Sequence, residues 1–510
     1  MSDRDENQAV KLTVFRFNPE TDKEPRYETY EAEWVPSLTA HMALTYINRH
    51  SRANVAFRRG CREAGCGVCT IMVNGVPELA CRVVVRDGDV LEPLGGYPVV
   101  RDLVIERTPQ TTEMFRKIKY GREGKPIGFV PAKPEEMSVS RALTICADCH
   151  GCNTICPPWL ETPDAFIGPI YLVNIIRAMF NPLEEYDRVA QAVEMGLYNC
   201  TMCRACTLSC PKDIEIAEGV IRARERAVKA DVLPNEVRKI RRNIMEADSL
   251  FGGNKKNLAS WAAQLGMSKS GKTLFFSSCE YSATEDGRRI LTLIAEMLRK
   301  AGVSLSYLYD EEPCCGGPLY FYGFHDEFKE KAAKTRKMLK EKGVEEIITP
   351  SPVCTYTFKE LYPKYAGDSS IRVRTVLEVI LEKIRSREIL PKSIGSKKVV
   401  FHDPPFLARF LDMIREPREV LSSISGVSLV EPKYYWGANT MGDGDMATSE
   451  EVNSMIARAR LKQLVDCGAD TIVTASASDL SKLKKAAQSL GKKDIEILDI
   501  VEFVARSLEV

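Results

Sequence analysis

Cysteine spacing constrains this sequence more than any other feature, because sixteen of its seventeen cysteines fall into four groups. The polar first ten residues lack the apolar core of a signal peptide, so we expect a cytoplasmic chain whose thiols stay reduced. Clustered thiols in a reducing compartment are usually metal ligands rather than disulfide partners. The grouping therefore predicts a protein organised around bound metal. Only Cys467 stands apart, on a helix predicted over residues 450–467, and we expect it to be a buried thiol.

The first group has the spacing Cys-x4-Cys-x2-Cys with a fourth cysteine after eleven further residues, which is typical of a plant-type [2Fe–2S] cluster. Its members are Cys61, Cys66, Cys69 and Cys81. Four thiolates must converge on two irons, so one tight loop has to supply three of them. Three glycines allow this loop to curl and let backbone N–H groups approach the sulfur atoms: Gly60, Gly65 and Gly67. A zinc knuckle is the alternative, and the long first gap and the glycines argue against it.

The second and third groups share the spacing Cys-x2-Cys-x2-Cys-x3-Cys-Pro, which is typical of bacterial two-cluster ferredoxins. In that arrangement the fourth cysteine of each run binds the cluster of the other run. The sequence thus predicts two [4Fe–4S] clusters, one held by Cys146, Cys149, Cys152 and Cys210, and the other by Cys156, Cys200, Cys203 and Cys206. Zinc sites and free thiols are the alternatives, and the presence of two such runs argues against both. We expect His150 to be a hydrogen-bonded neighbour of Cys149, with tuning of the cluster as the alternative.

Local patterns divide the chain into a β-rich part (residues 1–107), a helical part (108–265) and a part in which short apolar runs alternate with charged helices (266–510). The last pattern is typical of an α/β fold. The elements expected are a half-buried hairpin over 10–17 and 26–33, helices over 37–48 and 214–230, and strands at 274–276, 347–349 and 399–401.

The last part contains an internal repeat. Residues 272–279 resemble residues 398–405, and residues 347–351 resemble residues 472–476 at nearly the same offset. A duplicated α/β unit with copies at about 271–391 and 397–510 explains this offset.

Charge and hydropathy exclude two classes of partner. The chain carries 71 Lys and Arg against 70 Asp and Glu, so its net charge is only +1. We therefore do not expect it to bind nucleic acid. The longest apolar stretch, residues 166–173, is far shorter than the ~20 residues that a membrane-spanning helix needs. We therefore expect no transmembrane segment, and membrane association only through partners.

The sequence around the first group resembles a known family. Residues 58–69, followed by Val73-Asn74-Gly75 and Leu79-Ala80-Cys81, resemble the [2Fe–2S] segment of the iron–sulfur subunits of succinate dehydrogenase and fumarate reductase. Cys156-Pro157 and residues 166–169 resemble the helical domain of that family, and the likeness covers residues 10–235. It implies a β-grasp [2Fe–2S] domain, an α-helical two-cluster domain and a partner subunit that carries FAD. No catalytic residue for the fumarate or succinate chemistry is then needed on this chain.

Two departures from this family bear on function. The family's third centre is usually [3Fe–4S] because its second cysteine is missing, whereas Cys203 fills that position here and implies [4Fe–4S]. The family's quinone pocket uses a Ser and a Trp after the Cys-Pro pair and a His after the first cysteine of the third centre. This chain has Pro158, Leu160–Glu161 and Thr201 at those places, which argues against quinone reduction there. Quinone binding through altered contacts is the alternative.

The fourth group combines a single cysteine, a Cys-Cys-Gly-Gly run and a last cysteine, and it resembles the CCG domain of heterodisulfide reductases. The resemblance implies a [4Fe–4S] cluster that forms or cleaves disulfides, held by Cys279, Cys314, Cys315 and Cys354. Ser351 stands where that family has a further cysteine, and a degenerate fold without a cluster is the alternative. The second copy has Pro405, Thr440, Met441, Ser476 and Asp479 at the ligand positions. These are poor ligands for iron–sulfur, so we expect packing or docking there and no cluster.

The fusion of the two halves resembles the iron–sulfur subunits of archaeal thiol:fumarate reductases. This resemblance implies an oxidoreductase subunit that passes electrons between a flavoprotein and a thiol or other soluble donor through the CCG cluster. Two alternatives remain: a succinate:quinone oxidoreductase subunit, and a non-catalytic electron-carrying adaptor whose C-terminal domain serves for docking.

Overall fold

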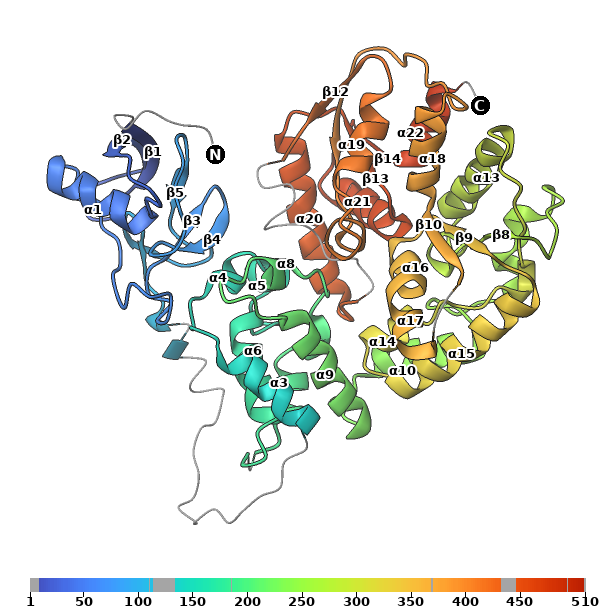
Figure 1. Ribbon diagram of the computed structural model, residues 1–510, viewed down its shortest axis with the longest axis horizontal. Coiled ribbons are helices and arrows are strands. Elements are labelled where there is room, and N and C mark those ends of the chain that lie inside the picture. The colour runs from blue at the N-terminus through green and yellow to red at the C-terminus, as the bar shows by residue number, and fades with distance from the viewer. Residues whose placement is uncertain are drawn as a thin grey trace. The chain divides into compact units, whose positions relative to one another are not determined.

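The structure is a computed structural model that describes residues 9–109, 111–112, 134–184, 186–367, 370–432, 446–492 and 494–508. The chain divides into two compact units (Figure 1). The first comprises the described parts of Met1–Leu197 and Arg204–Ala223, and the second those of Tyr198–Cys203, Arg224–Trp436 and Thr440–Val510. Helix and sheet are mixed, as in a multidomain α+β protein. Among the described residues, no helix combines the length and the apolar character that crossing a bilayer requires.

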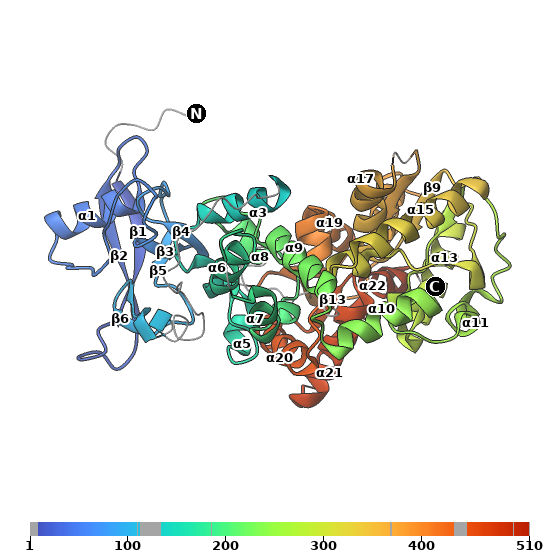
Figure 2. The same cartoon turned by 90° about the horizontal axis from the view of Figure 1, so that it is seen from below.

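The first unit begins with a five-stranded sheet of order β2-β1-β5-β3-β4 and continues with short helices (Figures 1 and 2). Its elements are β1 (Ala9–Arg16), β2 (Arg26–Glu33), α1 (Ala40–His50), β3 (Thr70–Val73), β4 (Val76–Leu79), β5 (Val90–Glu92), β6 (Val99–Arg101), β7 (Val104–Ile105), α3 (Pro134–Thr144), α4 (Gly151–Thr154), α5 (Pro157–Glu161), α6 (Pro169–Met179), α7 (Arg188–Glu194) and α8 (Ala205–Leu208). Helix α9 (Ile216–Lys229) spans both units.

The predicted hairpin is confirmed: β1 and β2 pair antiparallel, with Leu12 opposite Tyr30. Leu12 and Val14 are fully buried and pack with Leu44 of α1, which lies against β2 (Figure 2). The helix expected over 37–48 begins at Ala40, three residues later than expected. The Thr39 side chain caps it by accepting a hydrogen bond from the backbone N–H of Met42.

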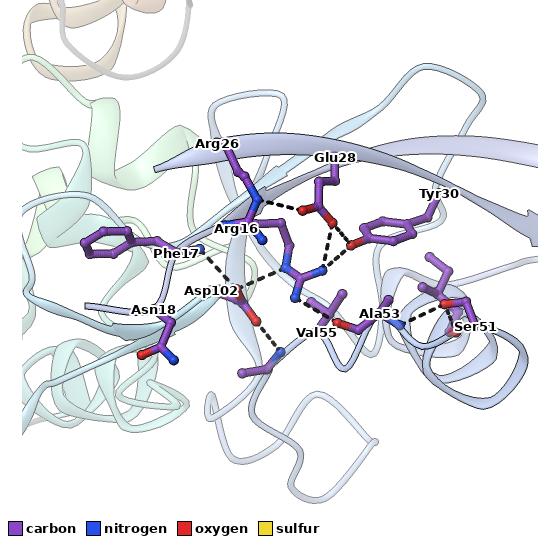
Figure 3. A network of polar contacts seen from close by, with 12 residues as sticks. Arg16, Phe17, Asn18, Arg26, Glu28, Tyr30, Ser51, Ala53, Val55 and Asp102 are labelled. Atoms are coloured by element: carbon purple, nitrogen blue, oxygen red, sulfur yellow. Dashed lines mark hydrogen bonds and ion pairs between the residues drawn. The ribbon is translucent and has the colours of Figure 1, made fainter. Parts of the chain in front are cut away.

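A buried ion pair ties the end of β1 to the chain that leads into the first cysteine loop (Figure 3). Arg16 Nε donates to Asp102 Oδ1 at 3.1 Å, and both side chains are less than a tenth exposed. Asp102 also accepts from the backbone N–H groups of Phe17 at 3.1 Å and Ala56 at 2.8 Å. On its other side, Arg16 bonds to Tyr30 and to Glu28. The carboxylate of Asp102 therefore joins its own segment to two others, the end of β1 and the chain at Ala56.

We expect Asp102→Asn to destabilise the first unit by about 3 kcal/mol, because it removes the buried carboxylate and leaves the Arg16 guanidinium with only the more exposed Glu28 as a charged partner. The measurement is the urea midpoint at which the visible circular dichroism of the [2Fe–2S] site disappears. Glu31→Gln on β2 is the matched control, since its ion pair with Lys11 is exposed and such pairs contribute about 0.5 kcal/mol or less. Equal midpoints for the two variants would contradict the expectation.

The second unit contains two parallel sheets with helices between the strands. Its first half comprises α10 (Asn235–Ala247), α11 (Lys255–Leu258), η2 (Ser260–Ala262), β8 (Thr273–Phe275), α12 (Cys279–Ser282), α13 (Glu285–Lys300), η3 (Tyr309–Glu311), α14 (Gly317–Phe321), α15 (His325–Glu341), β9 (Glu346–Thr349), α16 (Pro352–Tyr356), η4 (Thr357–Leu361), α17 (Tyr362–Ala366), β10 (Arg372–Thr375) and α18 (Val376–Arg385). Its second half comprises β11 (Lys397–Phe401), η5 (Phe406–Phe410), α19 (Arg415–Ser422), β12 (Val427–Val430), α20 (Glu450–Asp466), β13 (Thr471–Thr474), α21 (Ala477–Ser489), β14 (Glu496–Asp499) and α22 (Ile500–Ser507).

The two sheets run in the same order, β10-β9-β8 in one and β14-β13-β11 in the other, with β12 added at the edge of the second. All their neighbouring strands pair in parallel. In the first half Cys279 and Cys354 follow the carboxyl ends of β8 and β9, and in the second half Pro405 and Asp479 follow those of β11 and β13, as ligand sites of open parallel sheets usually do. The strands expected at 274–276, 347–349 and 399–401 are β8, β9 and β11.

The helices expected over residues 214–230 and 450–467 are present as α9 (Ile216–Lys229) and α20 (Glu450–Asp466). The expectation for Cys467 was wrong, since its side chain is half-buried rather than buried. Cys467 caps the end of α20, where the chain turns toward solvent, and its Sγ donates to the Gln463 carbonyl at 3.2 Å.

Candidate cluster-binding sites

The first cysteine loop, between α1 and β3, aims backbone N–H groups at two sulfur atoms. Cys61 Sγ accepts from the N–H groups of Glu63 at 3.4 Å, Gly65 at 3.3 Å and Cys66 at 3.3 Å. These hydrogen bonds lower the pKa of the Cys61 thiol to about 7. Burial raises the pKa of Cys69 to about 11, with Cys81 as its hydrogen-bonding neighbour. The loop thus brings the four predicted ligands together, and its N–H groups can stabilise thiolates bound to iron.

The loop depends on unusual backbone conformations. Arg62 and Ala64 have φ of 63° and 56°, in the left-handed region that few side chains adopt. At Gly60, a Cβ would lie 2.6 Å from Cys66 Sγ, so the glycine expected there is required. At Gly67, a Cβ would lie 2.2 Å from the Ala147 carbonyl oxygen. The first loop therefore lies directly against the second cysteine loop.

The second site gathers Cys146, Cys149, Cys152 and Cys210, all in the first unit. Burial raises the pKa of Cys146 to about 12 and also raises the pKa values of Cys149 and Cys152. Cys210 acts electrostatically on all three of these thiols, although it belongs to the other run in the sequence. Four neighbouring thiols, two of them buried and two half-buried, fit a metal cluster, whose positive iron would hold them as thiolates.

Two side chains near this site were not singled out from the sequence. The charge of Arg107 acts on both Cys69 and Cys149, so one guanidinium faces two proposed cluster sites, and burial lowers its pKa. Asp148 Oδ1 accepts a hydrogen bond from Cys146 Sγ at 3.8 Å. His150 behaves as expected: it is buried and hydrogen-bonded to the Tyr97 hydroxyl at 2.8 Å. Burial lowers the pKa of His150 to about 4, so its ring is neutral.

The loops of the second and third groups have the same backbone form. The residues two and four positions after the first cysteine are left-handed in both, at Asp148 and His150 in one and Met202 and Arg204 in the other. In the third group, Cys200 and Cys203 belong to the second unit, and Cys206 lies with Cys156 in the first. Burial raises the pKa of Cys200, which Cys203 raises further.

The fourth group converges on one small cavity in the second unit. Cys279, Cys314, Cys315 and Cys354 line it, together with Leu250, Ser278, Glu280, Pro318, Ser351, Val353 and Met446. The sulfur atoms of Cys315 and Cys354 are 3.3 Å apart, and the backbone N–H of Gly316 donates to Cys314 Sγ at 3.4 Å. A hydrogen bond from Cys279 lowers the pKa of Cys314 and raises that of Cys279. Four soft donors from three separate segments fit an iron–sulfur cluster.

The Ser351 side chain forms hydrogen bonds at the start of a helix in this structure. It caps α16, and its hydroxyl donates to Glu280 Oε2 at 2.7 Å. Glu280 Oε1 accepts from the hydroxyl of Ser476, in the second half, at 2.8 Å. One carboxylate next to Cys279 thus joins the corresponding serines of both halves, and no sequence pattern predicts this contact.

In the second half, Ser476 caps α21 as Ser351 caps α16, and Asp479 occupies the helical position that Cys354 has in the first half. Asp479 is fully buried, with His402 Nε2 3.4 Å from its carboxylate. Pro405 precedes η5. Thr440 and Met441 lie outside the described residues.

Comparison with known domain families identifies three kinds of domain. A family described as "2Fe-2S iron-sulfur cluster binding domain" matches residues 11–112, and one described as "4Fe-4S dicluster domain" matches residues 142–214. A family described as "Cysteine-rich domain" matches twice, over residues 273–359 and 399–484. The chain therefore carries [2Fe–2S] and [4Fe–4S] binding domains together with CCG domains.

Among curated proteins, one subunit of the fumarate reductase (CoM/CoB) of Methanothermobacter marburgensis is 28% identical over 499 residues, which cover 97% of this chain and 98% of that protein. The fumarate reductase iron–sulfur subunit of Escherichia coli O6:H1 is 31% identical over 224 residues, 42% of this chain and 91% of that protein. A crystal structure of a hypothetical protein from Helicobacter pylori, 14% identical, matches 100% of this chain and 96% of its own with a TM-score of 0.65, which shows likeness of fold alone.

Proposed function

The chain belongs to the family of fumarate reductase and succinate dehydrogenase iron–sulfur subunits, and on that premise we propose that it links an FAD-containing partner subunit to a thiol or another soluble donor. Its role as an electron-transfer subunit of an oxidoreductase follows from the family. What we propose is the identity of the two partners between which it passes electrons. Its support is that the relative of nearly equal length is a fumarate reductase whose name includes the thiols CoM and CoB.

We assign one [2Fe–2S] cluster, two [4Fe–4S] clusters and a further [4Fe–4S] cluster in the CCG domain. The proposed ligands are Cys61, Cys66, Cys69 and Cys81 for the first, Cys146, Cys149, Cys152 and Cys210 for the second, Cys156, Cys200, Cys203 and Cys206 for the third, and Cys279, Cys314, Cys315 and Cys354 for the fourth. The proposed domains are a β-grasp domain (1–107), a helical two-cluster domain (108–265) and a CCG domain (266–510). In the last, the copies at about 271–391 and 397–510 share sheet order, and the second has lost its ligands.

The observation that carries the proposal is the convergence of four buried or half-buried thiols on one cavity in the CCG domain. A larger cavity of about 470 Å³ shares Leu250 with it and includes Ala447, the neighbour of Met446 in the small cavity. The two cavities therefore lie next to each other in the same unit, and we propose the larger one as the space for a small thiol. Two thiols that form a disulfide release two electrons and two protons, which is what the reduction of fumarate to succinate consumes.

Two other functions compete with this one. A quinone-linked role is opposed by Pro158, Leu160–Glu161 and Thr201, which replace the expected quinone contacts. An adaptor role without thiol chemistry is favoured by the engagement of Ser351 with Glu280. The four cysteine thiols that the CCG site retains favour thiol chemistry over a docking role alone.

The test is anaerobic purification of the whole complex, followed by iron and sulfide analysis, EPR and assays of fumarate reduction. The ligand sets predict about fourteen irons per chain and no [3Fe–4S] signal in undamaged protein. Dithiols should support fumarate reduction and quinols should not. Quinol-dependent activity without dithiol-dependent activity would overturn the proposal in favour of the quinone-linked role.

A further inference from the structure

Two buried arginines hold the segment that carries Cys200 and Cys203. Arg224 Nη2 donates to the Cys200 carbonyl at 2.8 Å, and Arg409 Nη1 donates to the Cys203 carbonyl at 2.9 Å. Arg224 is 0% exposed and Arg409 is 7% exposed. Both guanidiniums therefore act on these two proposed ligand residues with little screening by water.

The two arginines come from different parts of the second unit. Arg224 lies on α9, with its guanidinium 5.1 Å from the ring of Tyr198 and 5.6 Å from that of Tyr322. Its Nη1 also donates to the Phe321 carbonyl at 3.0 Å, so Arg224 has structural contacts as well. Arg409 lies on η5, in the half of the CCG domain that has lost its cluster ligands.

The corresponding loop at Cys146 carries the opposite charge. It has the same alternation of left-handed residues, but Asp148 Oδ1 lies 3.8 Å from Cys146 Sγ. The cation Arg107 also acts on Cys149, but it is shared with Cys69 of the first loop. The two [4Fe–4S] sites thus share a backbone form, but a carboxylate lies beside a ligand of the Cys146 site, whereas two buried guanidiniums bond to the Cys200–Cys203 segment.

We propose that Arg224 and Arg409 raise the reduction potential of the cluster held by Cys200 and Cys203 above that of the cluster held by Cys146, Cys149 and Cys152. Reduction adds negative charge to a cluster, and a nearby buried cation stabilises the added charge whereas a nearby carboxylate opposes it. The proposal rests on the ligand sets assigned above. It also assigns a function to the half of the CCG domain that lacks the cluster-binding cysteines, namely to supply the cation Arg409.

The test is an EPR-monitored redox titration of the complete anaerobic complex with Arg409→Gln, Arg409→Lys and the control Arg506→Gln. Arg506 lies in the same half on α22, in an exposed ion pair with Glu496. We expect Arg409→Gln to shift the potential of one [4Fe–4S] signal downward without moving the [2Fe–2S] signal or the other two [4Fe–4S] signals. Arg409→Lys should leave the potential close to that of the unmodified complex, because it keeps the positive charge. Arg506→Gln should not shift the potential. An unmoved potential at full iron content, or an equal shift of every signal, would overturn the proposal.

A second measurement keeps the test decisive if Arg409→Gln loses iron. In the unmodified complex, the [4Fe–4S] signal that Cys203→Ser perturbs must be the one reduced at the higher potential. The reverse order would also overturn the proposal. Failure of the assigned ligand sets would look different, since the unmodified protein would then lack the iron or the second [4Fe–4S] signal altogether.

Discussion

Cys314→Ala is expected to abolish thiol-dependent fumarate reduction and to remove about four of about fourteen irons per chain. Cys314 is buried at the centre of its group, with hydrogen-bonding contacts to Cys279 and Cys315 and to the backbone N–H of Gly316. Without it, three thiols remain for a cluster that needs four. The loss should be confined to the CCG site, because no residue of the other proposed ligand sets lines that cavity.

Three measurements separate this effect from general damage. Iron content should fall while the EPR signals of the other clusters persist. Fumarate reduction with a reduced viologen dye, which can feed electrons in at other centres, should continue. Cys467→Ala is the matched control, since Cys467 is a half-buried thiol whose Sγ bonds only a carbonyl of its own helix among the hydrogen bonds described. Unchanged turnover of Cys314→Ala with thiol donors would support the adaptor function instead.

Much of the site could be predicted from the sequence because its information is local. Three ligands of each ferredoxin-type loop lie within nine residues of one another, and the glycine at Gly60 leaves room that the Cys66 sulfur needs. The strands of the α/β region were found from short apolar runs for the same reason. The start of α1 was misplaced by three residues, since the position of its cap is decided by one hydrogen bond, from Met42 to Thr39.

The parts that could not be predicted depend on contacts between distant residues. Arg409 lies 206 residues from Cys203, and no local pattern marks it as a partner of a cysteine loop. Glu280 could be noticed only beside Cys279, whereas its bonds to Ser351 and Ser476 require the folded arrangement of both halves. Ser351 itself appeared as a missing ligand in the sequence. In the structure it is a helix cap with a hydroxyl already engaged, and its substitution for cysteine therefore has a structural reason.

Cys210→Ala tests the exchange of fourth ligands between the two ferredoxin runs. Sequence order places Cys210 with Cys200, Cys203 and Cys206, yet in the structure its charge acts on Cys146, Cys149 and Cys152, although Cys206 acts on Cys152 as well. We therefore expect the variant to lose the [4Fe–4S] signal of the Cys146 site, with a fall of up to about four irons per chain. Electron transfer from thiols to fumarate should fall to background because one carrier of the chain is missing.

The readout that decides the matter is which signal disappears. Cys156→Ala is the reciprocal control, because the ferredoxin arrangement assigns Cys156 to the cluster of Cys200, Cys203 and Cys206. If the two arginines set the potentials as proposed, Cys210→Ala should remove the [4Fe–4S] centre of lower potential and Cys156→Ala the one of higher potential. Loss of the higher-potential centre in Cys210→Ala, at an otherwise complete iron content, would show that each run binds its own fourth cysteine and that the charges around Cys146 and Cys203 have been assigned to the wrong clusters.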